Sequence, residues 1–155
     1  MEKQHKPWET IVSEIQLSYK PEVKPSKRPK IQEPQDAYRL LLATWDKDKL
    51  EFVEQFKVIL LNKANAVLGI CTLSSGGISQ TLVDPKLVFA VAIKASATAI
   101  MLAHNHPSGS PVPSRPDKEL TRKIKMIGQW LDLLVLDHII VTPEGFYSFA
   151  LEGDL

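Results

Sequence analysis

Cysteine is almost absent from this 155-residue sequence, which contains Cys71 alone. A single cysteine excludes an internal disulfide framework and any zinc site built from several cysteines. No apolar run reaches the ~18 residues that a membrane-spanning helix needs, and the N-terminal segment MEKQHKPWET lacks the apolar stretch of a secretory signal. The formal net charge is only +1, so no strong attraction of the whole chain to nucleic acid or to a membrane is expected. These absences lead us to expect a cytoplasmic protein with one compact domain.

The first 34 residues differ in composition from the remainder. Residues 10–19, TIVSEIQLSY, alternate apolar and polar positions and predict a weak strand. Residues 20–34, KPEVKPSKRPKIQEP, are rich in proline and in basic residues, and proline at this density excludes a helix or a central strand. We interpret residues 1–34 as an N-terminal arm and linker, followed by a domain at residues 35–155. The alternative is a basic arm that contacts nucleic acid or a partner, but no aromatic residue interrupts the basic run to stack on bases.

Helical and strand patterns alternate after this linker. Helices are predicted over residues 34–46, 86–97 and 120–134. Strands are predicted over residues 54–61, 66–73, 98–103, 134–142 and 146–151, with a hairpin at each end of the domain. Such alternation is typical of an α/β domain with a mixed sheet. We therefore expect a three-layer α/β/α fold, in which the nearly all-apolar helix 86–97 is largely buried and residues 20–33 lie outside the sheet.

The segment HNHPSGSPVPSRPD, residues 104–117, carries half of the four histidines. It follows the predicted strand 98–103, and residues two apart on a strand point to the same side, so His104 and His106 are expected to face one way. Sites in open α/β sheets collect outside the ends of strands. Two imidazoles and the nearest following carboxylate, Asp117, can hold one zinc ion and leave a fourth position for water, as a catalytic zinc requires.

Ser114 and Asp117 have a second interpretation. The stretch SRPDKEL matches a capping box, in which a serine and an acid three residues later begin a helix. Taken alone, this pattern favours capping over metal binding. The combination of a buried strand end, paired histidines, a stiff proline loop and a following acid favours a site.

The same segment resembles the signature of RadC-like proteins, members of the JAB/MPN (JAMM) metalloprotease-fold superfamily. The superfamily pattern of His-x-His, seven residues, Ser, two residues and Asp falls on His104, His106, Ser114 and Asp117 without a gap. The similarity extends from about residue 35 to the C-terminus and includes LDHIIV. It implies a JAB/MPN (cytidine-deaminase-like) architecture, Zn²⁺ bound by the two histidines and the aspartate, and hydrolysis of a peptide or isopeptide bond. Residues 1–34 do not resemble the helix-hairpin-helix segment that such chains often carry.

The resemblance also implies a catalytic glutamate upstream of the histidines. Glu54 and Glu51 are both candidates, and we predict Glu54 because it directly precedes the strand and shares the parity of Phe56. Glu54 would act as the general base and Ser114 would donate a hydrogen bond to the developing oxyanion. Asn105, which faces the other side of its strand, is expected to hold the loop. His138 is expected to be a core histidine bonded to the backbone, and a role in the site is the alternative.

Three other functions compete with a zinc hydrolase. A zinc deaminase would need His-x-Glu and Pro-Cys-x-x-Cys, and the sequence contains neither. Nucleases named for His-Asn-His distribute these residues over a ββα unit, whereas here they form one tripeptide. The remaining alternative is a non-catalytic metal-binding interaction module associated with DNA repair or mobile-element processing. For the hydrolase we expect a protein or peptide substrate, nucleic acid contact has weak support, and the oligomeric state stays open.

Overall fold

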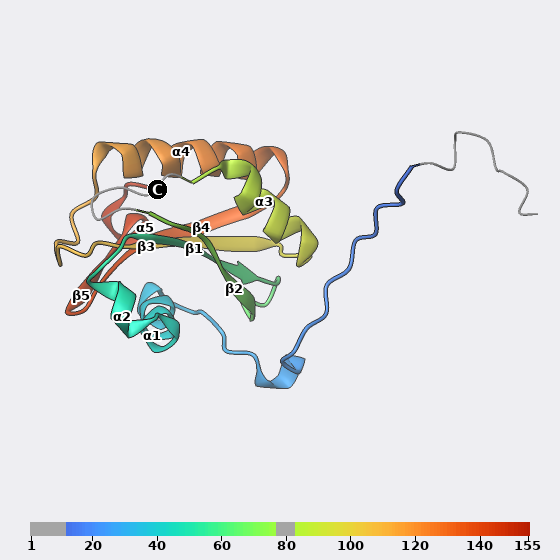
Figure 1. The fold of residues 1–155 in the computed structure, drawn as a ribbon, viewed down its shortest axis with the longest axis horizontal. Helices are drawn as coiled ribbons and strands as arrows, with labels where there is room; N and C mark the ends of the chain where they lie inside the picture. The colour runs from blue at the N-terminus through green and yellow to red at the C-terminus, as the bar shows by residue number, and fades with distance from the viewer. Residues whose placement is uncertain (1–11, 77–82) are drawn as a thin grey trace, which may run out of the picture.

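One five-stranded sheet forms the centre of the computed structural model, which describes residues 12–76 and 83–155 (Figure 1). The strands are β1 (Gln55–Leu61), β2 (Val67–Ser75), β3 (Ala99–Asn105), β4 (Leu134–Thr142) and β5 (Gly145–Ser148). Their order in the sheet is β2-β1-β3-β4-β5. β3 and β4 are parallel, and the other neighbours are antiparallel. The predicted mixed sheet with a hairpin at each end is confirmed.

Helices cover both faces of this sheet. α1 (Pro34–Thr44) and α2 (Lys47–Leu50) lie on one face, and α3 (Pro85–Lys94) and α4 (Arg115–Trp130) lie on the other (Figure 1). Each face has its own apolar core, one around Leu41 and Ile59 and the other around Val58 and Ile124. α4 is the crossover that parallel neighbours such as β3 and β4 require. The predicted three-layer α/β/α arrangement is confirmed.

β1 and β3 are the strands that lead into the candidate site. Every residue of β1 and of β3 is buried, because helices cover both faces of the central strands. Neighbouring residues on β1 therefore alternate between the two cores, as Val58 and Ile59 do. The carboxyl end of β3 is held by β1 on one side and β4 on the other, which makes it a rigid base for side chains.

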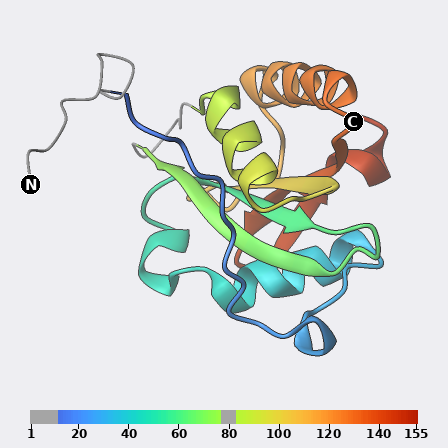
Figure 2. The same ribbon diagram turned by 90° about the vertical axis from the view of Figure 1, so that its right-hand side faces the viewer.

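The N-terminal arm differs from its prediction. Residues 12–19 form no strand, because neither of their faces is buried; residues 10 and 11 of the predicted strand lie outside the described residues. The arm passes beside β2 (Figure 2), where the Tyr19 hydroxyl donates to the Leu68 carbonyl at 2.7 Å. A 3₁₀ turn, η2 (Pro25–Lys27), follows.

Packing of the linker on the domain begins before residue 34. The Val67 N–H donates to the Pro29 carbonyl at 2.8 Å, and Lys30 forms an isolated β-bridge with Ala66. Ile31 is buried in the core beneath α1. Residues 29–31 are thus part of the folded unit, although residues 20–33 were expected to lie outside the sheet.

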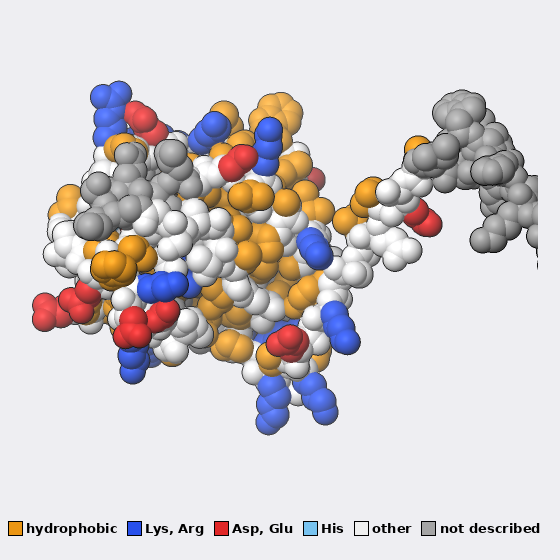
Figure 3. Space-filling view, viewed as in Figure 1, with side chains coloured by type: hydrophobic (Ala, Val, Ile, Leu, Met, Phe, Trp, Pro, Cys, Tyr) orange, Lys and Arg blue, Asp and Glu red, His pale blue; other side chains and the backbone are white. Residues whose placement is uncertain are grey.

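α3 is less buried than its apolar composition predicts. Val88, Phe89 and Ala92 face the core, whereas Leu87 and Ile93 are 50% and 53% exposed. One stripe of the helix is enough to cover the sheet, and no second layer formed by the described residues covers its outer side. Hydrophobic side chains consequently gather on the surface over α3 and the neighbouring β2 (Figure 3).

Several element ends also differ from the predictions. α3 ends at Lys94 rather than at residue 97, and α4 begins at Arg115 rather than at residue 120. α4 stops at Trp130 because Asp132 turns the chain with φ 52°, so residues 131–134 are not helical. The predicted strand 146–151 divides at Ser148, whose hydroxyl accepts from the Leu151 N–H and begins α5 (Phe149–Glu152). Within residues 12–76 and 83–155, no helix combines the length and the apolar character needed to cross a membrane.

Candidate metal centre

The two histidines of the HNH segment lie at the carboxyl end of β3. β3 ends at Asn105, and a backbone bond from the His106 N–H to the Val141 carbonyl at 3.1 Å keeps His106 in line with the strand. The alternation of side chains then brings the two imidazoles to the same side, with their Nε2 atoms 2.9 Å apart. This predicted orientation is confirmed.

Asp117 reaches these imidazoles from the first turn of α4. Its Oδ1 lies 3.3 Å from Nε2 of His104, and its Oδ2 lies 3.6 Å from Nε2 of His106. One ligand atom from each of the three residues falls within a group no wider than 4.8 Å. Two imidazole nitrogens and a carboxylate around one point form a donor set that fits a transition-metal ion such as zinc.

Ser114 explains why the two interpretations of this segment agree. Its hydroxyl caps α4 by accepting from the Asp117 N–H at 3.2 Å. Its backbone N–H and its hydroxyl both donate to Oδ2 of Asp117, each at 2.7 Å. The capping interpretation and the ligand interpretation are therefore compatible. The hydrogen bonds that cap α4 also hold the Asp117 carboxylate beside the two imidazoles.

The charges at this site favour a cation at its centre. Burial alone would raise the pKa of Asp117, but contacts with the imidazoles of His104 and His106 and a hydrogen bond from Ser114 hold that pKa well below its usual range. Burial alone would lower the pKa of His106, but its bonds to Asp117 and to the Ser110 carbonyl raise it. An ionised carboxylate beside two imidazoles is the state in which a metal would be bound.

The loop after β3 fixes the ring of His106. Nδ1 of His106 lies 2.7 Å from the Ser110 carbonyl oxygen, which can only accept, so the proton of the neutral ring sits on Nδ1. Nε2 of His106 then directs its lone pair toward the ligand cluster, which we define as His104, His106 and Asp117. Gly109 adopts φ +80° in this turn, a conformation that favours glycine.

His138 is the residue whose surroundings the sequence did not reveal. Its side chain is 0% exposed, and its ring bonds to Nδ1 of His104 at 2.8 Å and to the Thr121 hydroxyl at 2.6 Å. The expected backbone partner is therefore wrong. The register places His138 of β4 beside Leu102 of β3, two residues before His104 and on the same face of the sheet. Burial lowers the pKa of His138 well below its ordinary value and keeps the ring neutral.

Glu54 lies near enough to His106 to interact with it electrostatically, on the segment that leads into β1. It is 9% exposed, and its charge contributes to the raised pKa of His106. Glu51, the other candidate, is exposed on the turn that follows α2.

Asn105 holds the segment that carries Glu54. Its amide NH₂ donates to the carbonyls of Leu50 and Val53 at 2.7 and 2.9 Å, and its Oδ1 accepts from the Gln55 N–H at 2.7 Å. The sequence predicted that Asn105 faces away from the imidazoles and ties down a loop. The loop that it holds is the one before β1 and not the proline loop.

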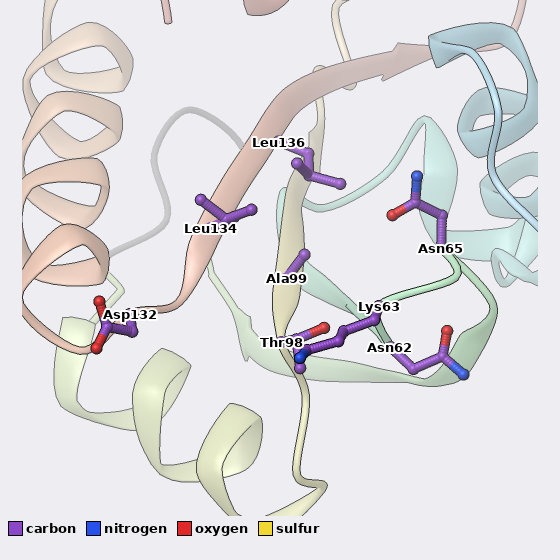
Figure 4. Close-up of a pocket in the computed structure, with 8 residues that line it drawn as sticks. All are labelled: Asn62, Lys63, Asn65, Thr98, Ala99, Asp132, Leu134 and Leu136. Atoms are coloured by element: carbon purple, nitrogen blue, oxygen red, sulfur yellow. The ribbon is translucent and has the colours of Figure 1, made fainter.

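A pocket of about 270 Å³ opens at the opposite end of β3 from this site. It is lined by residues of the β1–β2 turn, the start of β3 and the turn before β4, including Lys63, Ala99 and Asp132 (Figure 4). Ala99 and His104 are separated by roughly 17 Å along an extended strand. The pocket is thus a separate feature of the molecule.

Comparisons with known proteins agree with this arrangement. A family model described as RadC-like JAB domain matches residues 31–154. A UPF0758 protein of Flavobacterium johnsoniae is 48% identical over 100 residues, which cover 64% of this chain and 44% of that protein. UPF0758 proteins of Rubrobacter xylanophilus and Desulfitobacterium hafniense are 44% identical over 131 residues and 38% identical over 133 residues, covering 83% and 84% of this chain and 55% and 56% of the respective relatives. The chain spans about half the length of the curated relatives it matches. The family model, the relatives and the position of the histidine pair show that this chain belongs to the RadC-like JAB domain family.

Proposed function

We propose that the chain is a zinc-dependent hydrolase of peptide or isopeptide bonds. The observation that carries this proposal is the meeting of two imidazole Nε2 atoms and the Asp117 carboxylate at the end of a buried strand. His104, His106 and Asp117 would hold the ion and leave a position for water. Bound zinc supplies Lewis acidity, which makes water acidic near neutral pH and polarises a carbonyl group.

Glu54 is the proposed general base. It would take a proton from the attacking water and deliver it to the leaving amine. The reaction then needs no free hydroxide as the nucleophile and expels no amide anion. Its low exposure and its electrostatic effect on His106 support this role. The clamp by Asn105 supports it further, because a base has to be held within reach of the proton that it abstracts.

Ser114 is the proposed donor to the oxyanion that develops on the substrate carbonyl. At rest its hydroxyl donates to Asp117, so this role requires the hydroxyl to exchange partners. The backbone N–H of Ser114 also donates to Asp117, and it would keep the carboxylate in place during the exchange. Such a donor lowers the barrier by stabilising charge that is present only in the transition state.

A protein or peptide is the proposed substrate, and metal removal is the test. The purified protein would be assayed for zinc by elemental analysis and for cleavage of peptide and isopeptide-linked substrates. We expect one zinc ion per chain, and cleavage that a chelator abolishes and added zinc restores. If the double variant His104→Ala, His106→Ala retains stoichiometric zinc, the proposed metal site is wrong.

The N-terminal arm supports the second candidate, a metal-binding module that docks on a partner and cleaves nothing. Val12, Ile15 and Leu17 are exposed on an extended segment that precedes the basic linker. An arm of this kind has apolar side chains that a partner could bury. Full zinc occupancy without cleavage of any substrate in the same assay would favour this candidate, which would associate with proteins of DNA repair or mobile-element processing.

A further inference from the structure

His104 is oriented by groups on its far side, away from the ligand cluster. Its Nε2 faces Asp117, and its Nδ1 faces Nε2 of His138 at 2.8 Å. A neutral imidazole carries one proton, on either Nδ1 or Nε2, and only the form with a bare Nε2 can bind a metal through that atom. His104 therefore binds a metal only if His138 accepts a hydrogen bond from it.

The direction of this bond follows from the last acceptor in a chain of hydrogen bonds. The Thr121 hydroxyl lies 2.7 Å from the backbone carbonyl of Asp117, and a carbonyl oxygen can only accept. The single hydroxyl hydrogen of Thr121 is used there, so its oxygen accepts from Nδ1–H of His138 at 2.6 Å. Neutral His138 then has a bare Nε2, which accepts from Nδ1–H of His104.

We propose that His138 and Thr121 are positioning residues that set His104 in its metal-binding tautomer. His106 obtains the same tautomer directly, from the Ser110 carbonyl. His104 obtains it through two side chains, and the chain of bonds ends on the backbone of Asp117, the third proposed ligand. The inference rests on the proposed metal site, and it adds the residues that prepare that site before any ion binds.

The packing around the two rings supports a positioning role. The His138 ring is stacked on Phe149, with ring centroids 4.6 Å apart, and the His104 ring lies parallel to Phe56 at 6.2 Å. His104 and His138 are on neighbouring parallel strands, and Thr121 lies one helical turn after Asp117 on α4. The bonds therefore join the strand that carries one ligand to the helix that carries another.

The wild-type protein provides the first test. Long-range ¹H–¹⁵N spectra of the metal-free full chain at about pH 8, where ordinary imidazoles are neutral, distinguish the two tautomers of each histidine. We expect His104 with its proton on Nδ1 and His138 with its proton on Nδ1. A His104 ring with its proton on Nε2 would overturn the inference. This measurement needs no metal and no variant, so it does not depend on whether the proposed zinc hydrolase exists.

A matched pair of variants at Thr121 provides the second test. Thr121→Val keeps the shape but removes the hydroxyl, and Thr121→Ser keeps the hydroxyl. We expect Thr121→Val to weaken zinc by about 10- to 100-fold in a chelator competition, as is usual when the partner of a metal-bound histidine is lost. Thr121→Ser is expected to bind zinc within about 3-fold of wild type. If the methyl group of Thr121 mattered instead of its hydroxyl, Thr121→Ser would be the weaker binder of the two variants.

Three outcomes of these tests separate the possible failures. If wild type binds zinc and Thr121→Val keeps both its affinity and the Nδ1–H form of His104, the inference is wrong. If wild type shows the expected tautomers but binds no zinc, the proposed function fails and the hydrogen-bond chain stands. If Thr121→Val does not fold, His138→Phe replaces it, because phenylalanine keeps the stacking on Phe149 and has no ring nitrogen; unchanged zinc affinity in that variant contradicts the inference.

Discussion

At the scale of single residues, the two acids near the imidazoles are held in different ways. Asp117 is fixed by two bonds from Ser114 and contacts both histidines. Glu54 lies on a separate segment, which Asn105 clamps through the carbonyls of Leu50 and Val53. The proposed ligand and the proposed base can therefore be separated by mutation.

The first prediction compares these two acids. Glu54→Gln keeps the shape of the side chain but cannot accept a proton, so we expect normal zinc content and a loss of hydrolysis of about 100-fold or more. Asp117→Asn is expected to weaken zinc itself, because an amide is a poorer ligand than a carboxylate. Zinc content and hydrolysis are measured on both, with Glu51→Gln as the control. If Glu51→Gln is inactive while Glu54→Gln cleaves as well as wild type, the base is Glu51.

The second prediction concerns Asn105, which is buried and uses both ends of its amide. Asn105→Ala leaves the carbonyls of Leu50 and Val53 and the N–H of Gln55 without their partner. We expect the free energy of unfolding to fall by about 2–4 kcal/mol, since each buried unpaired group costs roughly 1–3 kcal/mol and the loop relaxes in part. Hydrolysis is expected to fall as well, because Glu54 loses its support, while zinc content is retained.

Urea unfolding of Asn105→Ala would be compared with Asn62→Ala. The Asn62 side chain also accepts two backbone N–H bonds, but in the turn between β1 and β2 and far from the candidate site. We expect Asn62→Ala to cost about 1 kcal/mol and to leave hydrolysis unchanged. Equal losses of stability and of hydrolysis in the two variants would show that Asn105 has no particular role at the site.

At the scale of elements, the junction between α4 and β4 limits which residue α4 can carry at position 128. A Cβ added at Gly128 would lie 2.5 Å from the Leu133 carbonyl oxygen, which is backbone and cannot move aside easily. The Leu133 N–H donates to the Gly128 carbonyl at 2.9 Å, so the two residues are held close together. This junction sets where β4 begins and therefore the register that brings His138 to His104.

The third prediction follows from this contact. Alanine normally stabilises a helix by about 0.5–1 kcal/mol relative to glycine, but Gly128→Ala is expected to destabilise the protein by about 2 kcal/mol. Thermal and urea unfolding would measure the change, with Lys123→Ala, at an exposed position of α4, as the control. A Gly128→Ala variant that is as stable as wild type would show that the two segments can separate at no cost.

At the scale of the whole molecule, the chain consists of a layered domain and an arm that leaves it at one edge of the sheet. Of the described residues 12–24, deletion of residues 1–24 removes only exposed ones, the bond from Tyr19 to the Leu68 carbonyl and the bond from the Lys27 N–H to the Lys24 carbonyl. The fourth prediction is therefore a melting temperature within about 2 °C of wild type. Deletion of residues 1–31 also removes buried Ile31, which contributes roughly 1.5–3 kcal/mol.

The second deletion is therefore expected to lower the melting temperature by about 5 °C or more, given a shift of roughly 2–4 °C per kcal/mol for a chain of this size. Differential scanning calorimetry of the two truncated chains would measure both values. If both truncated chains have the melting temperature of wild type, the contacts of residues 29–31 contribute nothing to stability. If the shorter deletion already lowers the melting temperature by 5 °C, the arm packs on the domain more than its exposure indicates.

The sequence by itself determined the layered fold, the residues proposed as ligands and the capping box that begins α4. Those features depend on local patterns: alternation along β3 orients His104 and His106, and the capping box places Asp117 in a first turn. The same local reasoning was wrong where burial depends on distant parts of the chain. It could not show that one side of α3 stays exposed, nor that residues 12–19 bury neither of their faces.

Only the tertiary structure decided which groups support the site. His138 bonds to His104 although the two residues are 34 positions apart in the sequence. Asn105 bonds to carbonyls that precede it by more than 50 positions. Such pairs are set by the order and register of strands in the sheet, which no periodicity along the chain encodes. A ligand set can be a property of a short segment, whereas the tautomer and orientation of its histidines depend on which strand and which helix lie beside it.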